Sequence, residues 1–258
     1  MPPPTGPRRL LVVGIGAGDP SLLTLQAAAA LAALDVVFVL DKGDELDDLA
    51  ALRRQVLAEH GRPDVELVAV ADPLRVLEGR DYDAAVARWH GERVAVLRDA
   101  VVGALDGGGT GGFLVWGDPS LYDSTLRILD DLTPALPWPV AVEVVPGVSS
   151  LHLLTARFGI PLNRVGAEVR ITTGRRLLDA PPTADCDVAV FLDAHCRFAE
   201  LPPDAPLDLF WGAYLGTTDE LLVSGRLAEV GHDVVARRAE ARSRKGWMFD
   251  TYLLRWRG

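Results

Sequence analysis

The chain has 258 residues, of which 49% are hydrophobic and 24% charged, a composition typical of globular proteins and unlike that of disordered or membrane proteins. Its 26 basic and 36 acidic side chains give a net charge of −10, which disfavours binding to nucleic acid and to anionic membranes. The longest nearly uncharged run, 27–40, is interrupted by Asp35 and is shorter than the roughly 20 apolar residues that a membrane span needs. We therefore expect a cytoplasmic protein that binds neither nucleic acid nor membrane.

The cysteine content and the N-terminal sequence narrow the class of protein further. Cys186 and Cys196 are too few for a disulfide framework or a four-cysteine metal site, so we interpret them as small buried hydrophobic side chains and expect no metal. Two arginines precede the first apolar run, but that run ends in a glycine-rich turn and not in a small-residue cleavage site. This pattern favours a first β-strand over a signal peptide.

Apolar runs and helix-forming segments alternate through the first part of the chain, which predicts parallel strands joined by helices. Strands are expected over 10–13, 35–40, 65–70, 112–116 and 138–145. Helices are expected over 24–34, 49–61, 81–104, 124–132 and 149–159. Thr24 is the expected N-cap of the first helix, and Gly91 marks a possible break in the third. The glycine cluster 107–112 is expected to be a flexible connection.

After Gly166 the apolar runs lie closer together, which suggests a smaller, mixed sheet. Strands are expected over 169–174, 186–193 and 207–216, and the segments 219–232 and 242–256 complete this half. The basic residues of the tail are interpreted as a solvated loop: Arg242, Arg244 and Lys245. The predicted fold is therefore α/β with two lobes, a parallel-sheet domain over 1–165 and a mixed-sheet domain over 166–258.

Three glycine turns follow three of the predicted strands. Gly14, Gly16 and Gly18 open the first turn, the sequence WGDPSLY (116–122) forms the second, and VPGVSS (145–150) forms the third. Ligands of open α/β sheets collect at the carboxyl ends of the strands, and glycine lets backbone amides approach a ligand closely. A shared ligand crevice explains the three turns together.

Two other interpretations of the first turn remain open. A dinucleotide fingerprint needs its third glycine three positions after the second, whereas Gly18 follows Gly16 by two, although Asp41 could act as the ribose-binding acid of a nicotinamide or flavin enzyme. The turn could also be purely structural.

The segments VVGIGAGDPSLLTLQA, WGDPSLYDST and VEVVPGVSSLHLLTARFGIPL resemble, in order and spacing, the successive motifs of the tetrapyrrole methylases, or class III methyltransferases. YLGTTDELLVSGRLAEV resembles the distal segment of the family, so the agreement spans nearly the whole chain. Ala17 departs from the pattern, because the family usually has proline there. The resemblance implies two α/β lobes with S-adenosylmethionine in the cleft between them, S-adenosylhomocysteine as a product, and a homodimer.

Within the family, FVLDKG and LFWGAYLGTTDELL look most like the member that methylates carbon 1 of precorrin-5 in cobalamin synthesis and releases acetate. Another precorrin or tetrapyrrole methyltransferase of the same family remains an alternative, as does a non-catalytic cofactor-binding protein built on the same lobes. The resemblance places the cofactor against these residues: Trp116, Gly117, Asp118, Leu121, Ser149, Ser150, Tyr214 and Leu215. Asp118 would pair with the methionine ammonium group or cap the following helix, and Ser149 could equally serve only as an N-cap.

The chemistry needs little from the protein beyond positioning, because a sulfonium methyl is already activated. Acetate loss also needs an attacking water, for which a general acid or base would help. We name Asp41 and Tyr122 as catalytic candidates, and His152 and His195 as weaker ones.

The substrate is a polycarboxylate tetrapyrrole, whose carboxylates would be bound best by arginine. The expected substrate-binding residues are Gly16, Ala17, Lys42, Arg53 and Arg54. Arg175 and Arg176 form a second pair that could serve instead.

Overall fold

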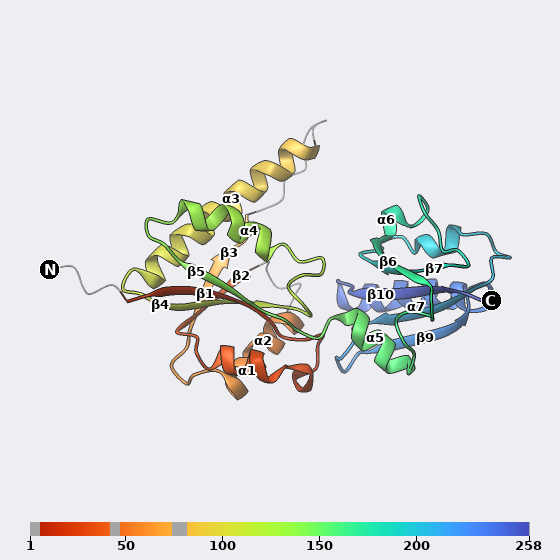
Figure 1. The fold of residues 1–258 in the computed structure, drawn as a ribbon, viewed down its shortest axis with the longest axis horizontal. Helices are drawn as coiled ribbons and strands as arrows, with labels where there is room; N and C mark the ends of the chain where they lie inside the picture. Colours follow the sequence, from red (N-terminus) through yellow and green to blue (C-terminus); the bar gives the residue numbers. More distant parts are fainter. Residues whose placement is uncertain (1–5, 42–46, 74–81, 258) are drawn as a thin grey trace. The chain divides into compact units, whose positions relative to one another are not determined.

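The computed structural model describes residues 6–41, 47–73 and 82–257. The chain divides into two compact units, Met1–Val148 and Ser149–Gly258, and each contains a five-stranded sheet (Figure 1). The boundary expected after residue 165 falls inside the second unit, because helix α5 (Ser150–Phe158) packs on strands of the second sheet. The two α/β lobes, one parallel and one mixed, are confirmed.

The first sheet has its strands in the order β3-β2-β4-β1-β5, and all the pairs are parallel. Its strands are β1 (Arg8–Gly14), β2 (Val36–Asp41), β3 (Glu66–Ala71), β4 (Gly109–Val115) and β5 (Ala141–Val145). Because all five strands run in the same direction, their carboxyl ends lie at one edge of the sheet. The three glycine turns follow β1, β4 and β5. These three strands are adjacent in the sheet, with β1 between β4 and β5.

Helices cover both faces of the first sheet (Figure 1). They are α1 (Leu25–Leu31), α2 (Asp47–His60), α3 (Tyr82–Leu105) and α4 (Thr125–Leu132). Residues of β1 alternate between the faces: Leu10 and Val12 pack in the cluster with α3 and α4, whereas Leu11 and Val13 pack in the cluster with α1 and α2. Thr24 is the N-cap of α1, as predicted, and its Oγ1 accepts a hydrogen bond from the Ala27 N–H at 3.0 Å.

Helix α3 continues through Gly91, so the predicted break there is wrong. One glycine inside a helix costs only about 1 kcal/mol relative to alanine, which packing can outweigh. Leu97, Val101 and Leu105 anchor the helix, because all three are almost fully buried in the core.

The glycine cluster is also not the predicted connection. Gly109–Gly112 begin β4, which lies at the centre of the sheet between β2 and β1. A Cβ on Gly111 would lie 2.6 Å from the Phe38 ring, and a Cβ on Gly112 would lie 2.6 Å from a methyl group of Leu34. Large side chains of neighbouring elements therefore fill the space above these glycines, and this packing makes the segment a buried strand.

Gly111→Ala should lower the free energy of unfolding by about 1–3 kcal/mol, because the added methyl group overpacks the core against Phe38. Gly103→Ala is the matched control: Gly103 lies in α3 with no atom within 4 Å of the new Cβ. This control should gain about 0.5–1 kcal/mol from helix propensity. Urea denaturation of both variants measures the difference, and equal effects at the two positions would contradict the packing explanation.

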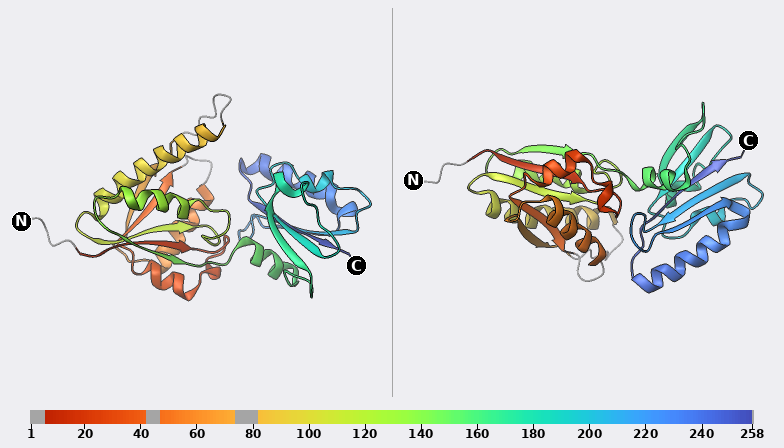
Figure 2. Two further views of the ribbon diagram at one scale, coloured as in Figure 1. Left: turned by 45° about the horizontal axis from the view of Figure 1, so that its top comes forward. Right: turned by 90° about the horizontal axis from the view of Figure 1, so that it is seen from below.

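The second sheet has the order β6-β7-β10-β8-β9. Its strands are β6 (Glu168–Thr173), β7 (Cys186–Phe191), β8 (Leu207–Ala213), β9 (Leu221–Arg226) and β10 (Asp250–Trp256). Only β6 and β7 pair in parallel, and the other pairs are antiparallel. Helix α7 (Leu227–Lys245) packs on one face and α5 on the other, while the short α6 (Gly174–Leu177) follows β6 (Figure 2). The basic tail residues lie in the last turn of α7, so the predicted solvated loop is wrong.

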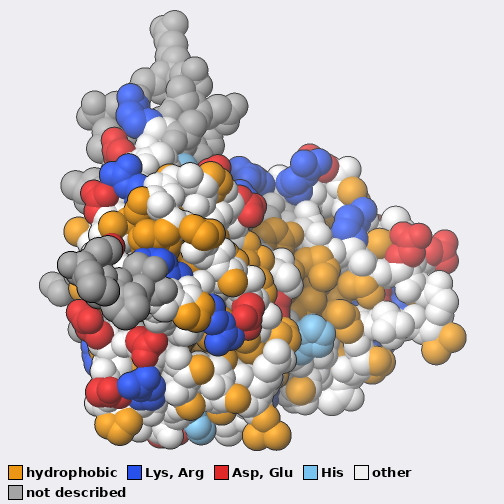
Figure 3. Space-filling view, turned by 60° about the vertical axis from the view of Figure 1, so that its left-hand side comes forward, with side chains coloured by type: hydrophobic (Ala, Val, Ile, Leu, Met, Phe, Trp, Pro, Cys, Tyr) orange, Lys and Arg blue, Asp and Glu red, His pale blue; other side chains and the backbone are white. Residues whose placement is uncertain are grey.

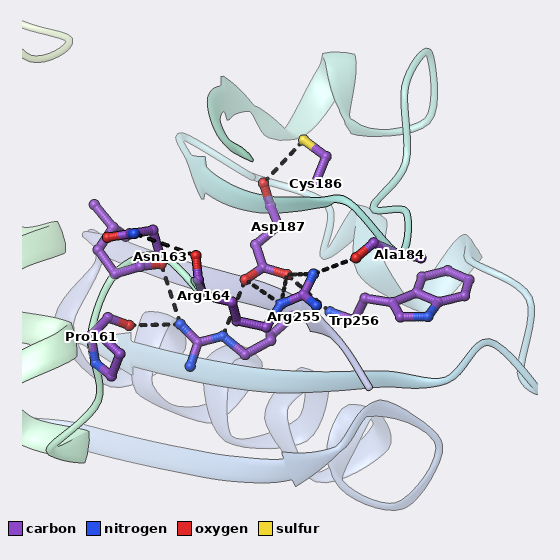
Figure 4. Close-up of polar contacts among 9 residues, drawn as sticks. Pro161, Asn163, Arg164, Ala184, Cys186, Asp187, Arg255 and Trp256 are labelled. Atoms are coloured by element: carbon purple, nitrogen blue, oxygen red, sulfur yellow. Dashed lines mark hydrogen bonds and ion pairs between the residues drawn. The ribbon is translucent and has the colours of Figure 1, made fainter. Parts of the chain in front are cut away.

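A buried carboxylate ties the segment after α5 to the second sheet (Figure 4). Asp187 on β7 is 0% exposed, and it accepts hydrogen bonds from Arg164 Nη2 at 3.0 Å, Arg255 Nε at 3.2 Å and the Trp256 N–H at 3.1 Å. Arg255 Nη2 also donates to the carbonyl oxygen of Pro161 at 2.6 Å. The two arginines therefore satisfy the buried charge and fix the backbone that leaves α5.

Asp187→Asn should lower the free energy of unfolding by about 3 kcal/mol or more, because it leaves two guanidinium groups without their carboxylate. Asp233→Asn breaks an exposed 2.7 Å pair with Arg237 and should cost about 0.5 kcal/mol or less. Thermal and chemical denaturation of the two variants test this difference. A loss no larger for Asp187→Asn than for its control would show that the cluster does not stabilise the fold.

Short 3-10 helices complete the description: Pro20–Leu22, Thr133–Ala135 and Arg197–Glu200. Within the described ranges, the chain contains no helix that is long and apolar enough to cross a membrane.

Candidate functional site

The three predicted glycine turns meet at the carboxyl edge of the first sheet. A Cβ on Gly14 would lie 2.6 Å from the Gly147 nitrogen and 2.8 Å from the Gly117 carbonyl oxygen, and a Cβ on Gly147 would overlap that same oxygen. Real Cβ atoms do not approach so closely, so the contact requires glycine at positions 14 and 147, while the φ of 72° at Gly117 favours glycine there. The turns therefore form one continuous surface made largely of backbone.

Hydrogen bonds join the first and second turns directly. The Gly117 N–H donates to the Gly16 carbonyl oxygen at 2.8 Å, and the Gly16 N–H donates to the Gly117 carbonyl oxygen at 3.3 Å. Gly16 has a φ of 77°, which favours glycine. Ala17 is fully buried. Gly16 and Ala17 thus shape the loop here, and their contact with a substrate stays a prediction.

Asp118 braces the second turn against the third. Its Oδ2 accepts a hydrogen bond from the Gly147 N–H at 2.9 Å, and its Oδ1 accepts from the Ser120 N–H at 2.9 Å and from the Ser120 hydroxyl. The proposed alternative, a cap on the following helix, is wrong, because α4 begins at Thr125 and its first N–H donates to Asp123 Oδ1 at 2.6 Å. Trp116 is half-buried against the core, and Leu121 is also half-buried.

Arg53 reaches the same edge of the sheet from α2. Its Nε donates to the carbonyl oxygen of Leu114 on β4 at 3.3 Å. Burial lowers the pKa of the Arg53 guanidinium, while the charge of Asp123 opposes this shift. Tyr122, beside Asp123, is 44% exposed and has a left-handed φ of 53°, and partial burial raises the pKa of its hydroxyl. Arg53, Tyr122 and Asp123 therefore gather near the glycine turns, and sequence reasoning missed Asp123.

The described part of the structure does not connect the other predicted residues of the first unit to the glycine turns. Arg54 lies on the exposed side of α2, where it lines a groove of about 310 Å³ together with Leu57, Arg62 and Leu67. The residues that line this groove lie on α2 and around the start of β3, and not at the carboxyl ends of the strands, where the glycine turns are. Arg53 and Arg54 therefore do not act as a pair. Asp41 ends β2, but its side chain and the whole of Lys42 lie outside the described residues.

In the second unit, Ser149 caps α5 as the sequence allowed. Its Oγ accepts a hydrogen bond from the His152 N–H at 3.3 Å and lies 2.7 Å from His152 Nδ1. Ser149 is buried, whereas the His152 side chain is exposed. Ser150 is the first residue of α5. This geometry makes Ser149 an N-cap, and cofactor contact by either serine stays a prediction.

Tyr214 and Leu215 follow β8 and are buried in the second unit. Tyr214 has a left-handed φ of 49°, and its hydroxyl donates to the Trp247 carbonyl oxygen at 2.7 Å. Leu215 and Leu154 of α5 both approach the bare backbone of Gly212. The side chains of Tyr214 and Leu215 thus pack within the unit, so any cofactor contact would fall largely to their backbone.

Sequence reasoning also missed a third strained position. Leu192, directly after β7, has a φ of 52° and is 62% exposed, an unusual combination for a leucine. The next residue, Asp193, is buried and accepts hydrogen bonds from the Tyr252 hydroxyl at 2.6 Å and the Arg197 N–H at 2.7 Å. Backbone strain of this kind clusters at functional sites. No local sequence pattern marks it, because it depends on the network around Asp193.

The weaker candidates lie elsewhere on the second unit. His195 is exposed, and its N–H donates to Asp193 Oδ1 at 3.1 Å. Arg175 and Arg176 are exposed on α6. Cys196 is buried, which raises the pKa of its thiol to about 11 and supports the expected packing role. Among the described residues, no group of three or more histidine, cysteine, aspartate or glutamate side chains could hold a metal ion.

A sequence model of the tetrapyrrole (corrin/porphyrin) methylases matches residues 9–231. The chain belongs to this family. It is 43% identical over 251 residues to precorrin-6A synthase [deacetylating] of Sinorhizobium sp., covering 97% of this chain and 96% of that protein. This membership favours methyl transfer over a nicotinamide or flavin enzyme.

Solved structures agree with the fold. A cobalamin synthesis related protein (CobF) from Corynebacterium diphtheriae superposes with a TM-score of 0.80 at 36% identity, covering 97% of this chain and 99% of that one. Uroporphyrin-III C-methyltransferase from Thermus thermophilus, crystallised with S-adenosylhomocysteine, gives a TM-score of 0.59 at 23% identity, covering 95% and 91%. The second likeness bears on the fold alone.

Asp118→Ala should weaken the binding of S-adenosylhomocysteine about tenfold, because it removes the acceptor that joins the second turn to Gly147. Isothermal titration calorimetry measures the dissociation constant. Asp130→Ala, an exposed carboxylate on α4, is the control and should leave it unchanged.

A second ligand separates the two roles considered for Asp118. Methylthioadenosine lacks the amino acid part of the cofactor, so it cannot pair with a carboxylate through an ammonium group. If Asp118 acts as a brace, Asp118→Ala weakens both ligands. A loss confined to S-adenosylhomocysteine would assign Asp118 to the ammonium group, and no loss for either would remove it from the site.

Proposed function

We propose that the chain transfers a methyl group from S-adenosylmethionine to carbon 1 of precorrin-5 and releases acetate, giving precorrin-6A. The near full-length identity of 43% to a precorrin-6A synthase carries the proposal. The meeting of three glycine turns at one sheet edge supports a site of the kind that the family uses.

We infer that S-adenosylmethionine lies against the three glycine turns. Gly14, Gly117 and Gly147 carry no side chains, so the three turns pack backbone against backbone at the edge of the sheet, where the cofactor is proposed to lie. When bound, the cofactor supplies an activated methyl group. The residues proposed to hold it are those of the second turn (Trp116, Gly117, Asp118 and Leu121), the start of α5 (Ser149 and Ser150) and the end of β8 (Tyr214 and Leu215).

Arg53 is the best supported of the proposed substrate contacts. Its Nε is fixed by the Leu114 carbonyl oxygen, and within the described ranges it forms no ion pair with a carboxylate. A guanidinium fixed in this way can receive a substrate carboxylate without first losing a partner. Lys42, Gly16 and Ala17 complete the proposed set, and Arg54 is its weakest member because it faces the separate groove.

Acetate release requires water to attack the acyl carbon and the bond from that carbon to the ring to break. Asp41 is the proposed base, because it ends β2 at the edge that carries the turns. Tyr122 is the proposed acid, because a tyrosine hydroxyl is protonated near neutral pH and can donate a hydrogen bond; partial burial raises its pKa and so favours the protonated form further.

We further propose a cytoplasmic homodimer that binds neither nucleic acid nor membrane. Val142 and Val144 on the edge strand β5 are exposed, although parallel sheets are usually covered on both faces. A second copy of the chain would cover them. Basic and acidic side chains are interspersed on the face shown in Figure 3, and the net charge of −10 disfavours binding to polyanions.

The proposal is tested with isolated precorrin-5 and S-adenosylmethionine that carries a labelled methyl group. We expect one labelled methyl group in the product and one acetate released per turnover, measured by mass spectrometry and an acetate assay. Methylation without acetate release would contradict the proposed conversion to precorrin-6A. The substrate would then be another tetrapyrrole.

A binding control separates the classes of enzyme. The protein should bind S-adenosylhomocysteine and not NAD in parallel calorimetric titrations. Binding of NAD alone would instead support an oxidoreductase.

A further inference from the structure

The loop after β8, residues 214–220, holds its shape with internal hydrogen bonds. The Thr217 N–H and hydroxyl both donate to the Tyr214 carbonyl oxygen, at 3.0 and 2.8 Å. The Gly216 N–H donates to Glu220 Oε2 at 2.7 Å. Tyr214 and Gly216 both adopt left-handed conformations, so the start of the loop is strained at a non-glycine residue.

Two adjacent carboxylates attach this loop to the carboxyl ends of two helices. Asp219 Oδ2 lies 2.5 Å from Lys245 Nζ, at the end of α7. Glu220 accepts a hydrogen bond from Arg157 Nε at 2.8 Å, in the last turn of α5. Each cation also complements the negative end of its helix dipole. The loop is thus fixed at two points on opposite faces of the second sheet.

Lys245 differs from an ordinary surface cation in its surroundings. Its side chain is 17% exposed, and its Nζ lies 5.5 Å from the centre of the Tyr214 ring and 5.9 Å from that of Trp247. These two rings meet edge to face, with their centres 5.0 Å apart. Cation–π attraction and the Asp219 pair therefore act on the same ammonium group. Lys245 connects both ends of the strained turn, Tyr214 and Asp219.

We propose that Lys245 is a positioning residue that holds the 214–220 loop in the conformation required for cofactor binding. The inference rests on the proposed function, in which Tyr214 and Leu215 contribute backbone groups to the cofactor site. Lys245 itself would touch neither cofactor nor substrate. It acts by stabilising the left-handed Tyr214, whose side chain is already fixed by its hydrogen bond to Trp247. Its loss should therefore affect the affinity for the cofactor more than the chemical step.

Lys245→Met keeps the length and apolar contacts of the side chain and removes its charge. We expect about a tenfold rise in the dissociation constant of S-adenosylhomocysteine and in KM for S-adenosylmethionine, with kcat changed less than about twofold. Lys245→Arg should restore most of the affinity, because it keeps the charge near Asp219. Arg237→Met on the same helix breaks an exposed pair and should leave both constants unchanged.

Asp219→Asn provides a second route if Lys245→Met does not fold, because it removes the other member of the pair. Because Asp219 also pairs with Arg244 Nη2 at 3.4 Å, the substitution should weaken binding at least as much as Lys245→Met, and the double variant should be no weaker than Asp219→Asn alone. Wild-type affinity in a folded Lys245→Met or Asp219→Asn variant would overturn the inference alone. Failure of the wild-type protein to bind S-adenosylhomocysteine would overturn the proposed function and this inference together.

Discussion

The contact between the backbones of Gly14, Gly117 and Gly147 is the constraint on which the first unit depends. It brings the ends of β1, β5 and β4 together so closely that no side chain can stand between the turns. Side chains that flank the glycines then fix the turns, and the Asp118 carboxylate joins two of them. The same contact explains why a two-residue glycine spacing replaces the dinucleotide fingerprint: the first turn here packs on other turns.

Arg53 differs in its partners from four arginines that serve the fold. Arg93, Arg164, Arg238 and Arg255 pair with buried or nearly buried aspartates and so serve the fold. Arg53 instead donates to a backbone carbonyl, with Asp123 acting on it through charge. A protein with a net charge of −10 can thus present positive charge locally.

Features set by local sequence could be predicted, and features set by distant packing could not. Thr24 as an N-cap, the parallel first sheet and the three turns follow from short patterns. Gly109–Gly112 look like a flexible connection in sequence, and only Phe38 and Leu34, far along the chain, make them a central strand. Likewise nothing near Lys245 in the sequence indicates its contact with Asp219 and the Tyr214 ring.

Each unit contains one tyrosine with a strained backbone conformation. Tyr122, in the turn after β4, and Tyr214, directly after β8, each occupy a left-handed conformation at a cost of about 1–3 kcal/mol. Such strain persists only where the surroundings determine the conformation, and the Tyr214 hydroxyl, ring and neighbouring carboxylates are all bound. Transfer of an already activated methyl group depends chiefly on holding two reactants in line. Rigid loops fixed by their neighbours meet that need better than a mobile loop with strong acid or base groups would.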